Sequence, residues 1–218
     1  MLREKLTALK KELIEYANFV QNMFDKSIKG LQKKDGAILQ DIIKKDEPKA
    51  NREEIQLDEL CTVLIAQYEP RASDLRTVLM ILKINNDLER MADHVINITE
   101  SSLFLIERPS MGMLDDVVKM SDLTSKMLQN SVDSFVNRDV EKARLVCRTD
   151  RQVNELRDKI VEKLISLMSA DSHNVERALH LMRITTNLER ISDLTTNICE
   201  DVIFMVEGQV IKHHHQGE

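Results

Sequence analysis

Pairs of oxygen-bearing side chains recur four residues apart along this 218-residue chain. They are Glu47 with Asn51, Glu89 with Asp93, Asp150 with Asn154, and Glu189 with Asp193. In a helix, side chains four positions apart share one face, and two like charges there destabilise the helix by about 0.2–0.5 kcal/mol. Carboxylate and amide oxygens are hard ligands that suit Mg, Mn, Ca or iron ions. The pairs therefore predict metal binding by helix faces.

Two expected turns would bring each acid–acid pair beside an acid–amide pair. In the first half of the chain, positions 47 with 93 and 51 with 89 centre on Pro70, where composition predicts a turn. In the second half, 150 with 193 and 154 with 189 centre on Asp171 and Ser172. Helices joined by a short turn run antiparallel, so each hairpin is expected to collect three carboxylates and one amide oxygen. The residues that would extend the two stripes are Asn97, Glu100, Asn197 and Glu200.

Other interpretations of the acids remain open. A salt-bridged face would use the nearby bases Arg52, Arg90, Arg157 or Arg190. Arg90 and Arg190 directly follow the glutamates and point to another side of the helix, which favours metal. A di-iron carboxylate enzyme would carry a Glu-x-x-His step, but His94 directly follows Asp93. We interpret His94 as a surface or interface residue and expect no enzyme, with a carboxylate-bridged metalloenzyme and a metal-free helical scaffold as alternatives.

The elements that would position these residues are all helices. Hydrophobic residues make up 42% of the chain and aromatics 3%, and the five glycines and three prolines are too few for many strands. A heptad-like spacing from Leu2 to Met23 predicts the first helix, with a break at 30–36. The other predicted helices cover 38–67, with a kink or restart at Asp46–Pro48, and then 75–98, 114–135, 146–167 and 175–202.

The six predicted helices form an internal repeat. Asn86-Asp-Leu-Glu-Arg-Met-Ala-Asp93 recurs as Thr186-Asn-Leu-Glu-Arg-Ile-Ser-Asp193, one hundred residues later. The clearest break in the chain is 107–112. We therefore predict an all-α protein of two tandem, similar three-helix bundles, at 1–107 and 113–208. Each bundle is expected to close its own core, and 209–218 is expected to be a flexible tail.

Composition also limits the partners and the location. The net charge is −6 with acids and bases interleaved, which argues against nucleic acid binding. The three cysteines show no metal or redox spacing, which suits a reducing compartment. The sequence shows no signal peptide and no apolar run of membrane-spanning length. We expect a cytoplasmic protein that is peripheral to the membrane only through partners. His213–His215 in the tail could be tag-derived.

At these motifs the sequence resembles the PhoU family of phosphate-uptake regulators. The resemblance runs from the first predicted helix to about Glu207, and the segments that carry it are 70–76, 88–94 and 188–193. It implies two three-helix bundles with multinuclear metal clusters, iron being favoured over zinc, manganese or magnesium. It also implies a homodimeric, non-enzymatic negative regulator of phosphate uptake and phosphate-responsive signalling. The implied partners are the ATPase subunit of a phosphate ABC transporter and a membrane sensor histidine kinase.

The family's ligand steps carry over to the four pairs above. Its acid-x-x-x-Asp step falls on Glu89 with Asp93 and on Glu189 with Asp193, and its acid-x-x-x-Asn step falls on Glu47 with Asn51 and on Asp150 with Asn154. Two departures stand out. Pro48 interrupts the first acid–amide step, and Asp46 adjoins Glu47, so either acid is a candidate ligand. Ala92 and Ser192 stand where the family often has glycine, and both are small enough for close approach of a metal or a helix.

Overall fold

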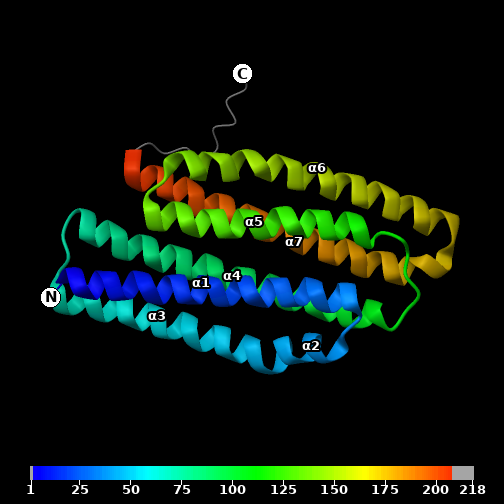
Figure 1. Ribbon diagram of the computed structural model, residues 1–218, viewed down its shortest axis with the longest axis horizontal. Coiled ribbons are helices and arrows are strands. Elements are labelled where there is room, and N and C mark those ends of the chain that lie inside the picture. The colour runs from blue at the N-terminus through cyan, green and yellow to red at the C-terminus, as the bar shows by residue number, and fades with distance from the viewer. Residues whose placement is uncertain (1, 208–218) are drawn as a thin grey trace, which may run out of the picture.

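Residues 2–207 are described by the computed structural model, and nearly all of them are helical (Figure 1). The elements are α1 (Leu2–Lys33), α2 (Gly36–Asp41), a π-helical turn η1 (Ile42–Asp46), α3 (Glu47–Tyr68), α4 (Ser73–Ile106), α5 (Leu114–Asn137), α6 (Val140–Ala170), a short 3-10 turn η2 (Ser172–Asn174) and α7 (Val175–Glu207). No strand occurs in this range, and the all-α prediction is confirmed. The predicted tail at 209–218, with His213–His215, lies outside the described residues.

The second predicted helix is divided into α2, η1 and α3. Pro48 lies in the first turn of α3, where its missing amide hydrogen is tolerated. The predicted break at 30–36 is shorter than expected, because α1 continues through Gly30 to Lys33. A Cβ at Gly30 would lie 2.5 Å from Leu39 Cδ2. The glycine therefore allows α2 to pack closely against the end of α1.

The two halves of the chain repeat one arrangement of helices. In the first half α1, α3 and α4 pack together, and in the second half α5, α6 and α7 do the same. Lys34 after α1 and Arg138 after α5 both adopt left-handed backbone angles that end a helix. The next residue, Asp35 or Asp139, caps the following helix through its carboxylate. The same local signals thus start the second helix of each half.

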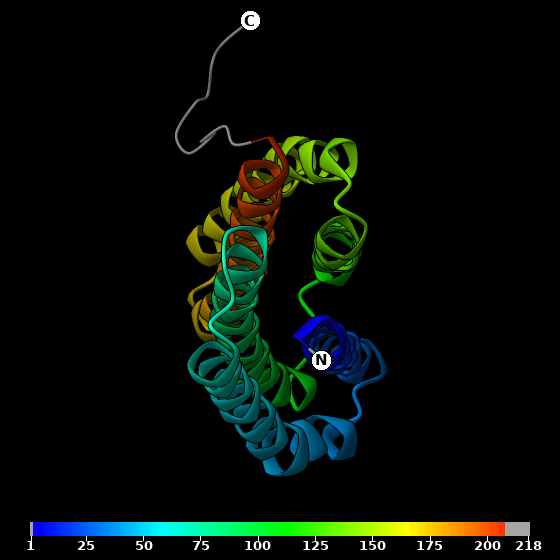
Figure 2. The ribbon, with the colours of Figure 1, turned by 90° about the vertical axis from the view of Figure 1, so that its left-hand side faces the viewer.

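The helices α4 and α7 lie side by side and antiparallel at the centre of the molecule (Figures 1 and 2). Lys83 Nζ on α4 lies 3.1 Å from Asp201 Oδ1 on α7. Arg183 Nη2 on α7 lies 3.0 Å from Glu100 Oε2 on α4. Buried hydrophobic residues of both halves form one cluster. The separate cores expected from the sequence are therefore joined into one, a feature that the periodicity of single helices does not reveal.

The contact between α4 and α7 continues through polar and aromatic side chains. His94 Nδ1 lies 2.9 Å from Asn187 Oδ1, so His94 is an interface residue, as predicted. Farther along, the rings of Phe104 and His180 stack with their centroids 3.8 Å apart. The Arg108 guanidinium lies over the Phe104 ring, 3.3 Å from its centroid. This stack anchors the end of α4 next to the linker between the halves.

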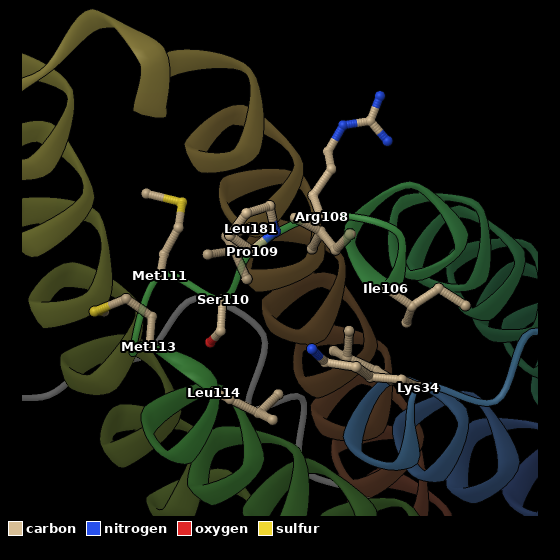
Figure 3. Close-up of a pocket in the computed structure, with 11 residues that line it drawn as sticks. Lys34, Ile106, Arg108, Pro109, Ser110, Met111, Met113, Leu114 and Leu181 are labelled. Atoms are coloured by element: carbon tan, nitrogen blue, oxygen red, sulfur yellow. The ribbon is translucent and has the colours of Figure 1, made fainter.

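A pocket lies beside that linker (Figure 3). Apolar side chains such as Leu31, Met113 and Leu181 line it, together with Lys34 and the linker residue Ser110. None of the eight predicted metal ligands contributes to its wall. Elsewhere, no helix among residues 2–207 is both long and apolar enough to cross a membrane.

Candidate metal centres

The acid–acid pairs lie on the outer faces of the two central helices. On α4, Leu88 and Met91 are fully buried, whereas Glu89 is half-buried and Asp93 is exposed. The positions one hundred residues later on α7 have the same distribution of burial. Because the apolar positions hold each helix in the core, the acidic positions are turned toward α3 or α6 and the solvent. Both halves therefore present carboxylates at corresponding places.

The second half brings its four predicted ligands together as neighbours. Asp150 on α6 accepts hydrogen bonds from Asn154 Nδ2 at 2.9 Å and from Ser192 Oγ on α7 at 2.6 Å. Asp193 lies close enough to Asp150 and Glu189 for both carboxylates to act on it electrostatically. The Asn154 side-chain oxygen is buried and has no hydrogen-bond partner. The predicted set of three carboxylates and one amide thus shares one small region between α6 and α7.

Burial, together with crowding of negative charge, raises the pKa of Asp193 to about 6. Burial is the largest cause, followed by repulsion from Asp150 and Glu189. Arg157 partly offsets this repulsion, and its Nη1 lies 3.1 Å from Glu189 Oε1. The salt-bridge alternative therefore holds for Glu189, whereas no ion pair within residues 2–207 involves Asp150 or Asp193.

The first half forms a different group of acids between α3 and α4. Glu89 lies near Asp93 and Glu54, and burial followed by repulsion from these carboxylates raises the pKa of Glu89. Tyr16 reaches this group from α1 and is only 1% exposed. Burial, and then the charges of Glu89, Glu54, Asp93 and Glu53, raise the pKa of Tyr16. Its hydroxyl has no hydrogen-bond partner, and leaving such a group unpaired costs about 1–3 kcal/mol.

Glu47 and Asn51 lie farther toward the start of α3 than Glu54. Glu47 is half-buried at the start of α3, and Asn51 is exposed one turn later. Within residues 2–207, no hydrogen bond or ion pair joins either side chain to the acids of α4. The neighbouring Asp46 lies 3.0 Å from Lys26 Nζ. Because Lys26 already neutralises Asp46, Glu47 is the better placed of the two acids to accept another cation.

The extension of the first stripe has another role. Asn97 and Glu100 both accept hydrogen bonds from the Arg183 guanidinium on α7, at 3.0 Å for Glu100 Oε2. Arg183 thus holds these two side chains in the contact between the halves. Arg183 therefore occupies the two side chains that were expected to extend the stripe beyond Asp93, and that extension stays a prediction.

The donor set suits a hard cation, although the side chains are not gathered around one point. Within residues 2–207, no three His, Cys, Asp or Glu side chains are arranged to hold a metal ion. Each half nevertheless combines carboxylates with one buried oxygen that lacks a hydrogen-bond partner, Tyr16 Oη in the first and Asn154 Oδ1 in the second. Oxygen donors of this kind fit Mg, Mn or iron ions. The assignment of the eight residues as ligands stays a prediction.

Two residues in these groups were not predicted as contributors, Tyr16 and Glu54. Glu54 follows Asn51 by three positions, as Arg157 follows Asn154. Because side chains three apart share a helix face, aligning the two repeats was the available signal for Glu54. Tyr16 comes from a different helix, and no local spacing in the sequence connects it to the acids.

Comparisons with known proteins match this duplicated architecture. The PhoU domain family matches the chain twice, at residues 13–102 and 117–202. The chain is 34% identical over 217 residues to a phosphate-specific transport system accessory protein PhoU homolog of Aquifex aeolicus, and the match covers 100% of this chain and 98% of the relative. It is 32% identical over 215 residues to PhoU homolog 2 of Thermotoga maritima, with coverage of 99% and 91%.

Solved structures share the fold over their whole length. The crystal structure of PhoU from Pseudomonas aeruginosa has a TM-score of 0.92 and 27% identity, covering 96% of this chain and 100% of that one. The phosphate transport system regulatory protein PhoU from Streptococcus pneumoniae has a TM-score of 0.89 and 25% identity, with coverage of 97% and 100%. Their names describe accessory or regulatory proteins, which confirms the expectation that the chain is not an enzyme. The chain belongs to the PhoU family.

Proposed function

We propose that this accessory and regulatory protein of phosphate transport binds metal ions at the acidic faces of α4 and α7, and that the loaded faces dock on its partners. The observation that supports the proposal most is the recurrence, in both halves, of carboxylates beside a buried oxygen without a hydrogen-bond partner. The carboxylates recur at corresponding places of the duplicated fold, while the buried oxygen comes from α1 in the first half and from α6 in the second. The named relatives link the family to phosphate-specific transport.

The residues that would hold the ions come from each hairpin separately. They are Glu47, Asn51, Glu89 and Asp93 in the first half and Asp150, Asn154, Glu189 and Asp193 in the second. When bound, a cation would supply the positive charge that offsets carboxylate repulsion. Metal binding and the deprotonated state of Asp193 would favour each other, because ligands bind in their charged form. Iron is favoured by the family resemblance, with manganese, magnesium and zinc as alternatives.

The proposed partners are the ATPase subunit of a phosphate ABC transporter and a membrane sensor histidine kinase. Without metal, the outer faces of α4 and α7 present negative charge around Glu89 and Asp193. With metal, the same faces would attract carboxylates of a partner or an oxyanion such as phosphate. We propose that this change controls docking, with the protein acting in the cytoplasm as a homodimer and meeting the membrane only through its partners.

The test measures binding of wild-type protein to each purified partner in the presence of metal and in the presence of chelator. The Asp93→Ala, Asp193→Ala double variant loses one carboxylate of each face. We expect the chelator and the double substitution to weaken docking to a similar extent. Elemental analysis should show that the chelated wild-type protein and the double variant have both lost metal. The matched control is the Glu59→Ala, Asp122→Ala double variant, which removes two exposed acids away from the faces.

Two results would contradict the proposal in different ways. Equal affinity in every condition, with metal loss verified, would restrict the metal to a structural role and move the docking surface elsewhere. Protein purified without added metal that never binds an ion, in wild type or control, would favour the metal-free scaffold. Size measurement by light scattering in the same samples tests the homodimer.

A further inference from the structure

The acidic groups of the two halves differ at one equivalent position of the repeat, where the first half has an acid and the second half has a base. Glu54 and Arg157 each lie three residues after the asparagine of the acid–amide pair. Glu54 acts as a further negative charge on Glu89. Arg157 instead forms an ion pair with Glu189 at 3.1 Å. The duplicated backbone therefore carries an acid in one half and a base in the other, directly beside the predicted ligands.

The helix that covers each group adds a second difference. In α1, the buried positions Leu13, Tyr16 and Val20 place a tyrosine hydroxyl against the acids. In α5, the same spacing of buried residues puts the apolar Met120 at the corresponding position. The first group thus has a buried hydroxyl that still lacks a partner, whereas the second has an apolar side chain in the corresponding place.

The state of each group without metal follows from these contacts. Within residues 2–207, no ion pair involves Glu89, Asp93 or Glu54. Among the described residues of that half, Arg90 forms an ion pair with Asp87 at 3.7 Å and offsets the repulsion on Glu89 only through its charge, without an ion pair to it. In the second half, Arg157 already occupies Glu189, and a cation would have to compete with the guanidinium for the same carboxylate oxygen.

We propose that the two centres are unequal. The first-half group, extended by Glu54 and Tyr16, is the tighter site for a hard divalent cation. The second-half group is a weaker site that fills when Arg157 leaves Glu189. This inference rests on the proposed metal binding. It adds the order in which the two centres load, and it adds Glu54 and Tyr16, which are not among the eight predicted ligands. Arg157 acts as a built-in competitor for the metal.

The test is a titration of the metal-free protein with Mn²⁺. Binding is measured by calorimetry and by the loss of the free-ion signal in electron paramagnetic resonance. Wild type should show two classes of site whose affinities differ by about tenfold or more, the range over which groups next to metal ligands change affinity. Asp93→Asn should remove the tight class and leave the weak one. Asp193→Asn should do the reverse.

Single variants at the differing position give the sharper comparison. Arg157→Gln should tighten the weak class by about tenfold, and Glu54→Gln should weaken the tight class by a similar factor. Arg151→Gln is the matched control on α6, because Arg151 is an exposed base paired only with the neighbouring-turn Glu155. The control for Glu54 is Glu15→Gln, at an exposed acid of α1 that forms an exposed ion pair with Lys11. Both controls should leave the two classes unchanged.

The outcomes separate this inference from the proposal on which it rests. If neither wild type nor any variant binds Mn²⁺, metal binding itself fails. If Mn²⁺ binds in a single class, or Asp193→Asn removes the tight class, the centres are not unequal in the proposed sense while metal binding stands. Circular dichroism verifies folding of each variant. If Arg157→Gln does not fold, the wild-type isotherm and the two aspartate variants still decide the result.

Discussion

Replacement of Asp193 by asparagine tests how strongly the second-half acids repel each other in metal-free protein. The carboxyl of Asp193 has its pKa raised from 3.8 to about 6 by burial and by Asp150 and Glu189. Because the charged form is the disfavoured one, the folded protein loses stability as the pH rises from about 4 to about 6, and the full cost remains above pH 6. Below pH 4 the carboxyl is protonated in both the folded and the unfolded chain, and the cost disappears.

The size of the effect follows from the shift. A rise of about two pKa units corresponds to about 3 kcal/mol at most. Because Asp193 is exposed on its outer side, solvent screens the repulsion, and we expect about 1 kcal/mol. For a chain of this length, that free energy corresponds to an increase in Tm of about 2–4 °C. Asp193→Asn should therefore melt higher than wild type at pH 8 and equally at pH 4.

The assay is thermal unfolding by circular dichroism between pH 4 and pH 8, with chelator present throughout. Asp122→Asn, at an exposed position of α5, controls for the loss of one surface charge. An increase in Tm that is as large at pH 4 as at pH 8 would refute an electrostatic origin. A decrease in Tm at pH 8 would show that the Asp193 carboxylate stabilises the fold without metal, contrary to the repulsion inferred from its neighbours.

Three further measurements test the packing. Gly30→Ala should lower the free energy of unfolding in urea by about 1–2 kcal/mol, because the new Cβ would lie 2.5 Å from Leu39 Cδ2; a stabilised variant would show that α2 is free to move. Asp201→Asn should lower it by about 1 kcal/mol, because Asp201 is 7% exposed and holds Lys83 across the two halves; no change would mean that this ion pair is dispensable. Cys147 should be the first cysteine that a thiol reagent modifies, as detected by mass spectrometry, ahead of the buried Cys61 and Cys199. Cys147 is only half-buried, and a hydrogen bond from the Cys199 thiol lowers its pKa.

The placement of the acid pairs was predictable because it depends on local features. Leu88 and Met91 fix which face of α4 is buried, and the period of the helix then dictates that Glu89 and Asp93 lie on another face. The turn at Pro70 fixes which part of α3 runs beside that face. These relations involve neighbours in sequence or a single short turn, so the pattern of residue types contains them.

The contacts across helices could not be predicted in the same way. Arg183 binds Glu100 only because α4 and α7 pack against each other, and nothing in the pattern of either helix reveals that pairing. Tyr16 contributes to the first-half group only because α1 packs against α3 and α4. The Arg157 pair with Glu189 was one of several possible salt bridges, and only the packing of α6 on α7 selects it.

Separation of the two acidic groups determines how they can communicate. The charges that raise the pKa of Asp193 all come from the second half, and those that act on Glu89 all come from the first. Direct repulsion between the groups is therefore too weak to make one centre sense the charge of the other. Any coupling between them must pass through the packing of α4 on α7, where the Lys83 and Arg183 ion pairs and the His94–Asn187 contact tie the halves together. Loading of one centre should consequently leave the affinity of the other unchanged unless these contacts rearrange.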